Sequence, residues 1–213
     1  MFVFHKRNTW KGSAHFWNER YANGGNSGAG SYNRLAEFKA KIINDFVSNN
    51  KIQTIIEWGC GDGNQLSLAK YPNYIGYDVS PQAIKICKNK FKDDSNKKFF
   101  CSKSIFFKST TAELSLSLDV LYHLIEDNVF DKYMKQLFTS STKYVIIYSC
   151  NDTESTVNAI HVKHREFTQW IKENVSSKWK LKSLIKNEYP FDANDPENTS
   201  WSNFYIYEKI TSC

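Results

Sequence analysis

Several features that would place this 213-residue chain in a special class are missing from its sequence. Its apolar runs are much shorter than the ~20 residues that a membrane-spanning helix needs, and the apolar stretch within residues 1–7 is too short for a signal peptide. The five cysteines are scattered and include no C-x-x-C pair of the kind that binds zinc or forms a redox dithiol. We therefore expect a cytoplasmic protein with reduced thiols, no metal site and no membrane segment.

Disorder and low complexity are excluded as well, because 41% of the residues are hydrophobic and 23% are charged, as in ordinary globular proteins. The length suits a single domain over residues 1–213. The net charge of +6 is mild, and the many lysines between residues 85 and 98 are typical of a solvated surface. The sequence has no appended nucleic-acid-binding module, so nucleic acid is not the expected partner, and the oligomeric state is left open.

Short β-branched segments alternate with amphipathic segments along the chain. Strands are predicted at residues 52–58, 74–77, 98–101, 114–118, 143–149, 179–185 and 204–208. Helices are predicted at residues 10–22, 33–50, 64–69, 81–91, 129–138 and 163–175. This alternation predicts a mostly parallel sheet with helices on both faces. Because such sheets bind ligands at the carboxyl ends of their strands, functional residues are expected directly after strands.

A glycine-rich turn follows the first predicted strand, with the sequence E-W-G-C-G-D-G over residues 57–63. Glycines at positions 59, 61 and 63 let the backbone turn tightly and approach a ligand, and an ordinary turn rarely needs three of them after an acidic residue. Asp78 closes the next strand, where its carboxylate could accept hydrogen bonds from ribose hydroxyls. The pattern therefore predicts a nucleoside cofactor.

The identity of that nucleoside follows from the spacing and from the charge. Dinucleotide sites use G-x-G-x-x-G, whereas this chain has G-x-G-x-G and places Asn64 after the last glycine. The Glu57 carboxylate would repel a pyrophosphate but suits a cationic cofactor that carries a sulfonium and an ammonium group. A dinucleotide cofactor is therefore disfavoured.

The E-x-G-x-G-x-G segment and Asp78 resemble the first two motifs of class I S-adenosylmethionine (SAM)-dependent methyltransferases. This resemblance implies a Rossmann-like α/β fold with a seven-stranded, mostly parallel sheet in the order 3-2-1-4-5-7-6, whose last strand is antiparallel. It implies SAM as the cofactor and S-adenosylhomocysteine (SAH) as the product. The segment S-L-D-V-L-Y-H-L at residues 117–124 also resembles the family segment that lines the methyl-donor pocket.

The resemblance implies a set of cofactor-binding positions, some of them outside the glycine turn. A residue after the third strand usually contacts the adenine, and the chain offers Ser102 or Ser104 there. An N-terminal helix and a glycine-rich loop at about residues 10–33 form either a lid over SAM, with Tyr32 or Arg34 reaching the cofactor, or a plain surface loop. The expected cofactor-binding residues are Glu57, Gly59, Cys60, Gly61, Gly63, Asp78, Val79, Ser102, Asp119 and Tyr32.

The acceptor site is expected near histidines that follow the fourth and fifth strands. His123 is either a general base in the cleft or a residue that closes a turn. His161, His164 and Arg165 form either an anion-binding cluster or a solvated helix start; cations oppose the dipole at a helix N-terminus, which favours the binding site. We expect His123, His161 and His164 to be catalytic, and Tyr122 and Arg165 to bind the acceptor.

The expected reaction is methyl transfer from SAM to an oxygen or nitrogen nucleophile of a small, anionic metabolite. The segments G-G-N-S-G-A-G-S-Y at residues 24–32 and H-V-K-H-R-E-F-T-Q-W at residues 161–170 are similar to segments of small methyltransferases encoded with bacterial surface-polysaccharide genes, including those for capsular O-methyl phosphoramidate. The alternatives are an RNA or DNA methyltransferase and a non-catalytic SAM-binding subunit.

Overall fold

A computed structural model of the chain describes residues 10–102, 110–153 and 159–210. These described residues form one seven-stranded sheet in the order β3-β2-β1-β4-β5-β7-β6. The strands are β1 (Thr54–Trp58), β2 (Asn73–Asp78), β3 (Lys97–Cys101), β4 (Ala112–Leu118), β5 (Ser141–Ser149), β6 (Trp179–Ile185) and β7 (Asn203–Lys209). Strands β1 to β5 pair with one another in parallel, whereas β7 is antiparallel to its neighbours β5 and β6. The strand order and the antiparallel last strand that the sequence predicts are confirmed.

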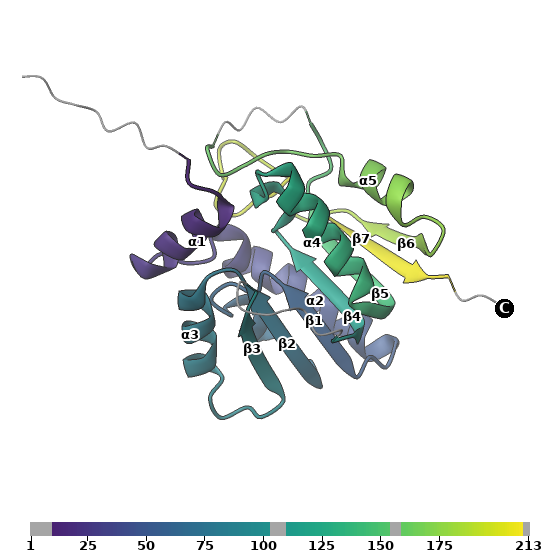
Figure 1. Cartoon of the computed structure of the whole chain (residues 1–213), viewed down its shortest axis with the longest axis horizontal. Coiled ribbons are helices and arrows are strands. Elements are labelled where there is room, and N and C mark those ends of the chain that lie inside the picture. The colour runs from purple at the N-terminus through teal and green to yellow at the C-terminus, as the bar shows by residue number, and fades with distance from the viewer. Residues whose placement is uncertain (1–9, 103–109, 154–158, 211–213) are drawn as a thin grey trace, which may run out of the picture.

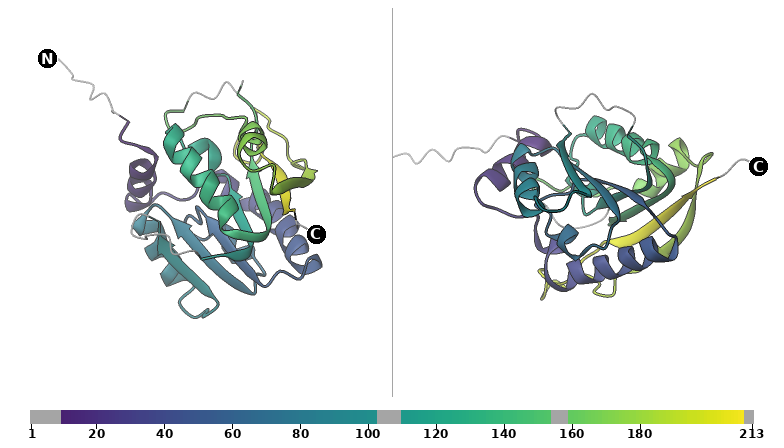
Figure 2. Two further views of the ribbon diagram at one scale, coloured as in Figure 1. Left: turned by 45° about the vertical axis from the view of Figure 1, so that its right-hand side comes forward. Right: turned by 90° about the horizontal axis from the view of Figure 1, so that it is seen from below.

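Helices cover both faces of the sheet (Figure 1, Figure 2). They are α1 (Ser13–Ala22), α2 (Asn33–Asn49), α3 (Pro81–Lys90), α4 (Asp127–Thr139) and α5 (Phe167–Asn174), with short 3-10 helices at Ala29–Ser31, Gln65–Leu68 and Leu121–His123. Ile43 of α2 and Ile84 of α3 belong to one buried core, while Met134 of α4 and Phe167 of α5 belong to the core on the other face. Among the helices in the described ranges, none is long and apolar enough to cross a membrane.

The start of α3 shows how local sequence sets an element boundary. The Ser80 hydroxyl accepts a hydrogen bond from the Ala83 backbone N–H, which satisfies a donor that the helix itself leaves unpaired. Pro81 occupies the first turn, where its missing N–H costs nothing. Ser80 therefore caps α3 and fixes the chain directly after Asp78.

Helix α1 lies at the carboxyl ends of the parallel strands (Figure 1). The Glu126 carboxylate accepts hydrogen bonds from the Ser13 backbone N–H at 2.9 Å and from its hydroxyl at 2.6 Å. The Ser13 hydroxyl oxygen in turn accepts a bond from the Ile125 N–H at 3.1 Å. The N-terminal helix is therefore fastened to the segment between β4 and α4, beside the edge where ligands of this fold bind.

Two predicted helices differ from the structure. Residues 64–69 form only the 3-10 helix Gln65–Leu68, because this segment returns to β2 within a few residues. Helix α5 begins at Phe167 and not at residue 163, so His161, His164 and Arg165 precede the helix. The argument that these cations oppose a helix dipole is therefore wrong. Lys163 and Arg165 instead extend to the Asp127 carboxylate.

Candidate active site

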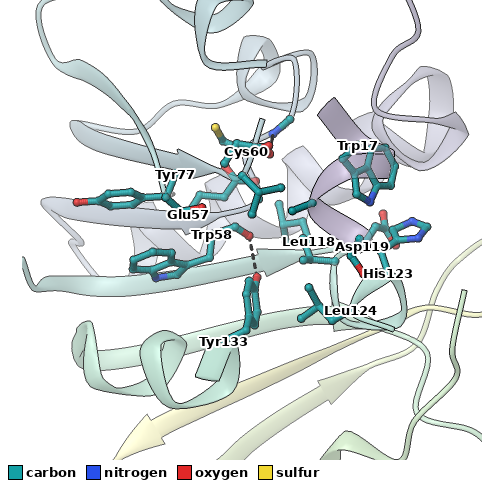
Figure 3. Close-up of a pocket in the computed structure, with 18 of the residues that line it drawn as sticks. Trp17, Glu57, Trp58, Cys60, Tyr77, Leu118, Asp119, His123, Leu124 and Tyr133 are labelled. Atoms are coloured by element: carbon teal, nitrogen blue, oxygen red, sulfur yellow. Dashed lines mark hydrogen bonds between the residues drawn. The ribbon is translucent and has the colours of Figure 1, made fainter. Parts of the chain in front are cut away.

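A cavity of about 740 Å³ opens at the carboxyl ends of β1, β2 and β4 and continues along α4. Figure 3 shows Glu57 and Cys60 toward one end of it and Trp17, Asp119 and His123 toward the other. The predicted residues that line this cavity are Glu57, Gly59, Cys60, Gly61, Asp78, Val79, Ser102, Asp119 and His123. The structure thus brings most of the expected cofactor-binding residues together around one space. Ser104 lies outside the described residues.

The glycine turn holds three residues at positive φ, namely Gly59 at 85°, Gly61 at 56° and Gly63 at 71°. A Cβ on Gly59 would lie 2.5 Å from the Val120 side chain, so this glycine lets the turn after β4 pack against the turn after β1. A Cβ on Gly63 would lie 2.8 Å from the ring of Phe91, which follows α3, and 3.1 Å from the Cys87 sulfur on α3. Gly63 therefore serves the packing of α3 and, unlike Gly59 and Gly61, does not line the cavity.

The Asp78 carboxylate lies beside the glycine turn. It accepts hydrogen bonds from the Gly61 N–H at 3.0 Å and from the Ser80 N–H at 2.8 Å. Burial raises the pKa of Asp78 to about 6, although these backbone bonds oppose the rise. An ionised carboxylate has about four lone-pair sites, so it can still accept a hydrogen bond from a further donor such as a ribose hydroxyl.

Glu57 is held beneath the turn. Its carboxylate accepts a hydrogen bond from the Tyr74 hydroxyl at 2.6 Å, and burial raises the pKa of Glu57 to about 7. A cation bound in the cavity would favour the ionised form and lower that pKa. Glu57 therefore fits a positively charged cofactor, as the sequence suggests.

The glycine-rich loop between α1 and α2, residues 23–32, closes over the turn; we call it the lid. The Ser27 N–H donates to the Asp62 carboxylate at 3.0 Å, and the Asp62 N–H donates to the Ser27 hydroxyl at 3.0 Å. The Tyr32 hydroxyl donates to the same carboxylate at 2.8 Å. Tyr32 was expected to reach the cofactor, but here it anchors the lid. Arg34, the other candidate, binds the loop before β7 through Asp195 at 3.0 Å.

Asp62 and Lys39 are site residues that the sequence reasoning missed. Asp62 stands inside the glycine motif, and its carboxylate joins that motif to the lid. Lys39 lines the cavity and lies fully buried, with its ammonium 2.7 Å from the Asp119 carboxylate. The signal for Lys39 was a lysine on the buried face of a helix, four residues after Leu35 and four before Ile43.

His123 lines the cavity at the end opposite Glu57, where the Trp17 ring packs against it at 4.8 Å. Its Nδ1 lies 3.0 Å from the His161 carbonyl oxygen. Because a carbonyl only accepts, Nδ1 carries the proton and Nε2 keeps a lone pair. Burial lowers the pKa of His123 to about 4, so the ring is neutral at physiological pH. His123 closes the turn and also offers a proton-accepting nitrogen.

His161 lines neither this cavity nor the smaller one described below. Its ring stacks on Phe16 of α1 with centroids 4.5 Å apart and on His123 with centroids 5.4 Å apart. Burial, and then the positive charge of Arg20, lower the pKa of His161. The position of His161 is therefore that of a contact between α1 and the loop after β5.

A second cavity of about 170 Å³ adjoins the first, and Asp119 lines both. Tyr122, His164 and Trp201 line this smaller cavity. The Tyr122 hydroxyl donates to Asp119 at 2.9 Å, and His164 Nδ1 lies 3.1 Å from the Cys150 sulfur. Two of the residues that were expected around the acceptor, Tyr122 and His164, therefore line a cavity that Asp119 shares with the larger one.

Arg165 lies apart from both cavities. Its guanidinium donates to the Asp127 carboxylate at 2.6 Å and to the carbonyls of Leu124 and Ile125 at 3.0 Å each. The Lys163 ammonium also binds Asp127, at 2.6 Å. In this arrangement Arg165 holds the segment after β4 in place, and its charge is balanced by Asp127.

Comparisons with known proteins agree with this geometry. Residues 56–141 match a family model described as a methyltransferase domain, and no curated protein matches the chain. The N-methyltransferase NodS from Bradyrhizobium japonicum, in complex with SAH, has a TM-score of 0.72 at 15% identity, covering 93% of this chain and 98% of that one. Magnesium protoporphyrin IX methyltransferase (ChlM) from Synechocystis, with bound SAM, has a TM-score of 0.68 at 10% identity, covering 95% and 100%.

The methyltransferase domain of bacterial CtHen1 is similar too, with a TM-score of 0.64 at 19% identity over 82% of this chain and 100% of that one. At these identities the likeness to solved structures shows the fold. One of these proteins is named as an N-methyltransferase and another as a magnesium protoporphyrin IX methyltransferase, so the shared fold does not specify an acceptor. The match of residues 56–141 to a methyltransferase domain and the Rossmann-like fold of the described residues agree with each other.

Proposed function

We propose that this protein transfers a methyl group from SAM to an oxygen or nitrogen nucleophile of a small molecule. The observation that carries the proposal is that one cavity joins the glycine turn and Asp78 at one end to His123 at the other. Bound SAM would supply an electrophilic methyl group on its sulfonium. The residues of the chain would hold that methyl group and the acceptor in line and exclude water.

The residues around the cavity divide this work. Asp78 would accept hydrogen bonds from the ribose, while Glu57 and Asp119 would place negative charge near the cationic part of SAM. His123 would accept the proton of an acceptor hydroxyl or amine through Nε2, because Nδ1 is already committed to the His161 carbonyl. The lid over the glycine turn would keep water away from the reacting atoms.

The acceptor would occupy the space beside Asp119. The second cavity, lined by Tyr122 and His164, adjoins the cofactor cavity at that point and supports a small acceptor. Asp127 balances the charge of Arg165, so the anionic character of the acceptor is proposed from the sequence alone. A role in capsular O-methyl phosphoramidate synthesis remains a proposal that rests on the sequence resemblance and on such an anion.

The test is a turnover assay with labelled SAM. Purified protein is given a panel of small phosphorylated acceptors, their uncharged analogues, bulk RNA and bulk DNA, and SAH release is followed. Methylation of a small acceptor supports the proposal, and a preference for the phosphorylated member of a pair supports the anion. Salt-sensitive methylation of the polymers alone would instead assign a nucleic-acid methyltransferase. SAH binding without turnover on any acceptor would assign a non-catalytic subunit.

A further inference from the structure

Two side chains of the second cavity, His164 and Cys150, share one hydrogen bond. Burial lowers the pKa of His164 and raises the pKa of the Cys150 thiol to about 12, so at physiological pH the ring is neutral and the thiol keeps its proton. The Cys150 sulfur lies 3.1 Å from His164 Nδ1. Because sulfur is a weak acceptor and a neutral imidazole nitrogen is a good one, the thiol donates to Nδ1. The proton of the ring then resides on Nε2.

His164 Nε2 is therefore an N–H donor, and it has no acceptor within the described part of the chain. The atom is buried, and no described residue accepts a hydrogen bond from it. Buried polar groups in folded proteins normally have a partner, so this donor points to an acceptor that arrives with a ligand. His164 lines the second cavity, and Nδ1 is already bound to Cys150, so Nε2 is the nitrogen left for that ligand.

Two hydroxyl groups of the same cavity have the opposite capacity. The hydroxyls of Tyr122 and Ser202 both donate to the Asp119 carboxylate, at 2.9 Å and 3.0 Å. Their protons are thereby used, while lone pairs on both oxygens can still accept. The cavity thus offers one donor and two acceptors. A ligand with several hydroxyl groups meets both needs, because each hydroxyl donates and accepts, whereas a phosphate or carboxylate oxygen only accepts.

The charge of the lining also favours an uncharged ligand. No lysine or arginine is among the described residues that line the second cavity, and Asp119 places a carboxylate there. That carboxylate would repel an anion. It is already paired with Lys39 at 2.7 Å, so it does not need a cation from a ligand.

The size of the second cavity and the position of Trp201 fit a single ring. A volume of about 170 Å³ is close to the ~150 Å³ cavity that holds a benzene molecule, so one six-membered ring fills the space. Trp201 lines the cavity, and Phe191 stacks on one face of its ring with centroids 3.4 Å apart. Only the opposite face and the edges of the Trp201 ring can therefore meet a ligand.

We propose that the second cavity binds the uncharged ring of a sugar, with one hydroxyl accepting a hydrogen bond from His164 Nε2. Another sugar hydroxyl donates to the hydroxyl oxygen of Tyr122 or Ser202, and the apolar side of the sugar ring packs on Trp201. Cys150 is a positioning residue, because its thiol keeps the proton of His164 on Nε2. A phosphate group on such a sugar would lie outside the second cavity.

The proposal rests on the proposed function, since the sugar would be the methyl acceptor. Tyr122 lines the second cavity, and its neighbour His123 lines the first, with their ring centroids 4.5 Å apart. A sugar in the second cavity therefore lies one side chain away from the proposed base. The reacting group would be a sugar hydroxyl, from which His123 would take the proton.

The binding test uses saturation-transfer NMR with the methyl glycosides of glucose, galactose and mannose, and with methyl phosphate as the anionic probe. At least one glycoside should bind more tightly than methyl phosphate. His164→Phe keeps a ring but removes the donor, so it should weaken glycoside binding about 5- to 10-fold. His15→Phe is the matched control, because His15 is exposed on α1, and it should leave the affinity unchanged.

The role of Cys150 has a spectroscopic test. Long-range ¹H–¹⁵N NMR of the wild type should show His164 protonated on Nε2. Cys150→Ser still offers a donor to Nδ1, so it should keep this tautomer and the glycoside affinity. Cys150→Ala removes the donor, so the proton should also populate Nδ1 and glycoside binding should weaken. Equal tautomers and equal affinities in the two variants would show that the thiol does not position His164.

Three results would overturn the sugar site itself. They are the absence of binding by every glycoside, tighter binding of methyl phosphate than of any glycoside, and an unchanged glycoside affinity in folded His164→Phe. Calorimetry with SAH on the same wild-type sample keeps the two proposals apart. Protein that binds a glycoside but not SAH would refute the proposed function, whereas protein that binds SAH but no glycoside would refute only the sugar site.

Discussion

The ammonium of Lys39 lies 2.7 Å from the carboxylate of Asp119, and this ion pair joins helix α2 to the turn after β4. Asp119 lines the cofactor cavity and the smaller second cavity, and it also binds Tyr122 and Ser202. A ligand that moves Asp119 in the first cavity therefore also changes the wall of the second. This contact gives a physical route by which the cofactor could prepare the site for its acceptor.

The first prediction concerns Asp78. Asp78→Ala should weaken SAH binding by about 1.5 to 3 kcal/mol, because the hydrogen bonds from the ribose to a charged acceptor are lost. Calorimetry with SAH measures the effect. Asp93→Ala is the control, since Asp93 is exposed in the segment after α3. If Asp78→Ala leaves the SAH affinity unchanged, Asp78 does not bind the cofactor.

Patterns that act over a few residues could be predicted from the sequence. The Ser80 cap involves only the neighbouring residues of the chain, and the glycine turn directly follows a strand. Both can therefore be recognised from a short stretch of sequence. The strand order is one that the motif of residues 57–63 and Asp78 implies through family resemblance, and the structure has the same order. These features need no knowledge of distant contacts.

Partners that are far apart in the sequence could not be predicted. Tyr32 meets Asp62 across 30 positions, and Arg165 meets Asp127 across 38, so a pattern within one segment does not reveal either contact. A surface charge and a charge that is held by a distant partner look alike in sequence. For Lys39 the sequence does carry a signal, because this lysine lies on the apolar face of α2, where a charged residue is unexpected.

The second prediction concerns Gly61. A Cβ at this position would lie 2.3 Å from the Ser27 hydroxyl of the lid, and its φ of 56° already disfavours a side chain. Gly61→Val should therefore prevent the lid from closing on the turn and raise the SAH dissociation constant by about tenfold or more. Gly24→Val is the control, because Gly24 also has a positive φ but its Cβ would meet nothing within 4 Å. Equal effects of the two changes on SAH affinity would contradict a role for this contact.

The third prediction concerns the base. His123→Ala should lower kcat by about 10²-fold if Nε2 accepts the acceptor proton. Burial lowers the pKa of His123 to about 4, so the neutral form persists well below the usual histidine range. The rate attributable to His123 should then be flat from pH 8 to about pH 6 and fall only as the pH approaches about 4. A fall in kcat centred near pH 6.5 would show that the ring titrates as an exposed histidine.

The lowered pKa of His123 also predicts how the stability of the protein depends on pH. The folded pKa of His123 lies below its unfolded value of about 6.5, so between pH 6.5 and about 4 the unfolded chain binds more protons. The contribution of His123 to the free energy of unfolding is therefore complete above pH 6.5 and is lost as the pH falls through that window. The melting temperature of wild type should exceed that of His123→Gln by a constant amount above pH 6.5, and this difference should shrink as the pH falls toward 4. Parallel curves across this range would contradict the buried, neutral ring.

The fourth prediction separates two roles for Arg165. If the residue bound the acceptor directly, Arg165→Met would raise KM and leave the melting temperature unchanged. The structure instead shows its guanidinium on the carbonyls of Leu124 and Ile125, which would lose their donors, at a cost of about 1 kcal/mol or more. For a chain of this size, each kcal/mol lowers the melting temperature by about 2 to 4 °C. Asp127→Asn removes the charge partner but keeps both carbonyl bonds, so it should change the melting temperature less than Arg165→Met. A raised KM at an unchanged melting temperature in Arg165→Met would instead show that Arg165 binds the acceptor.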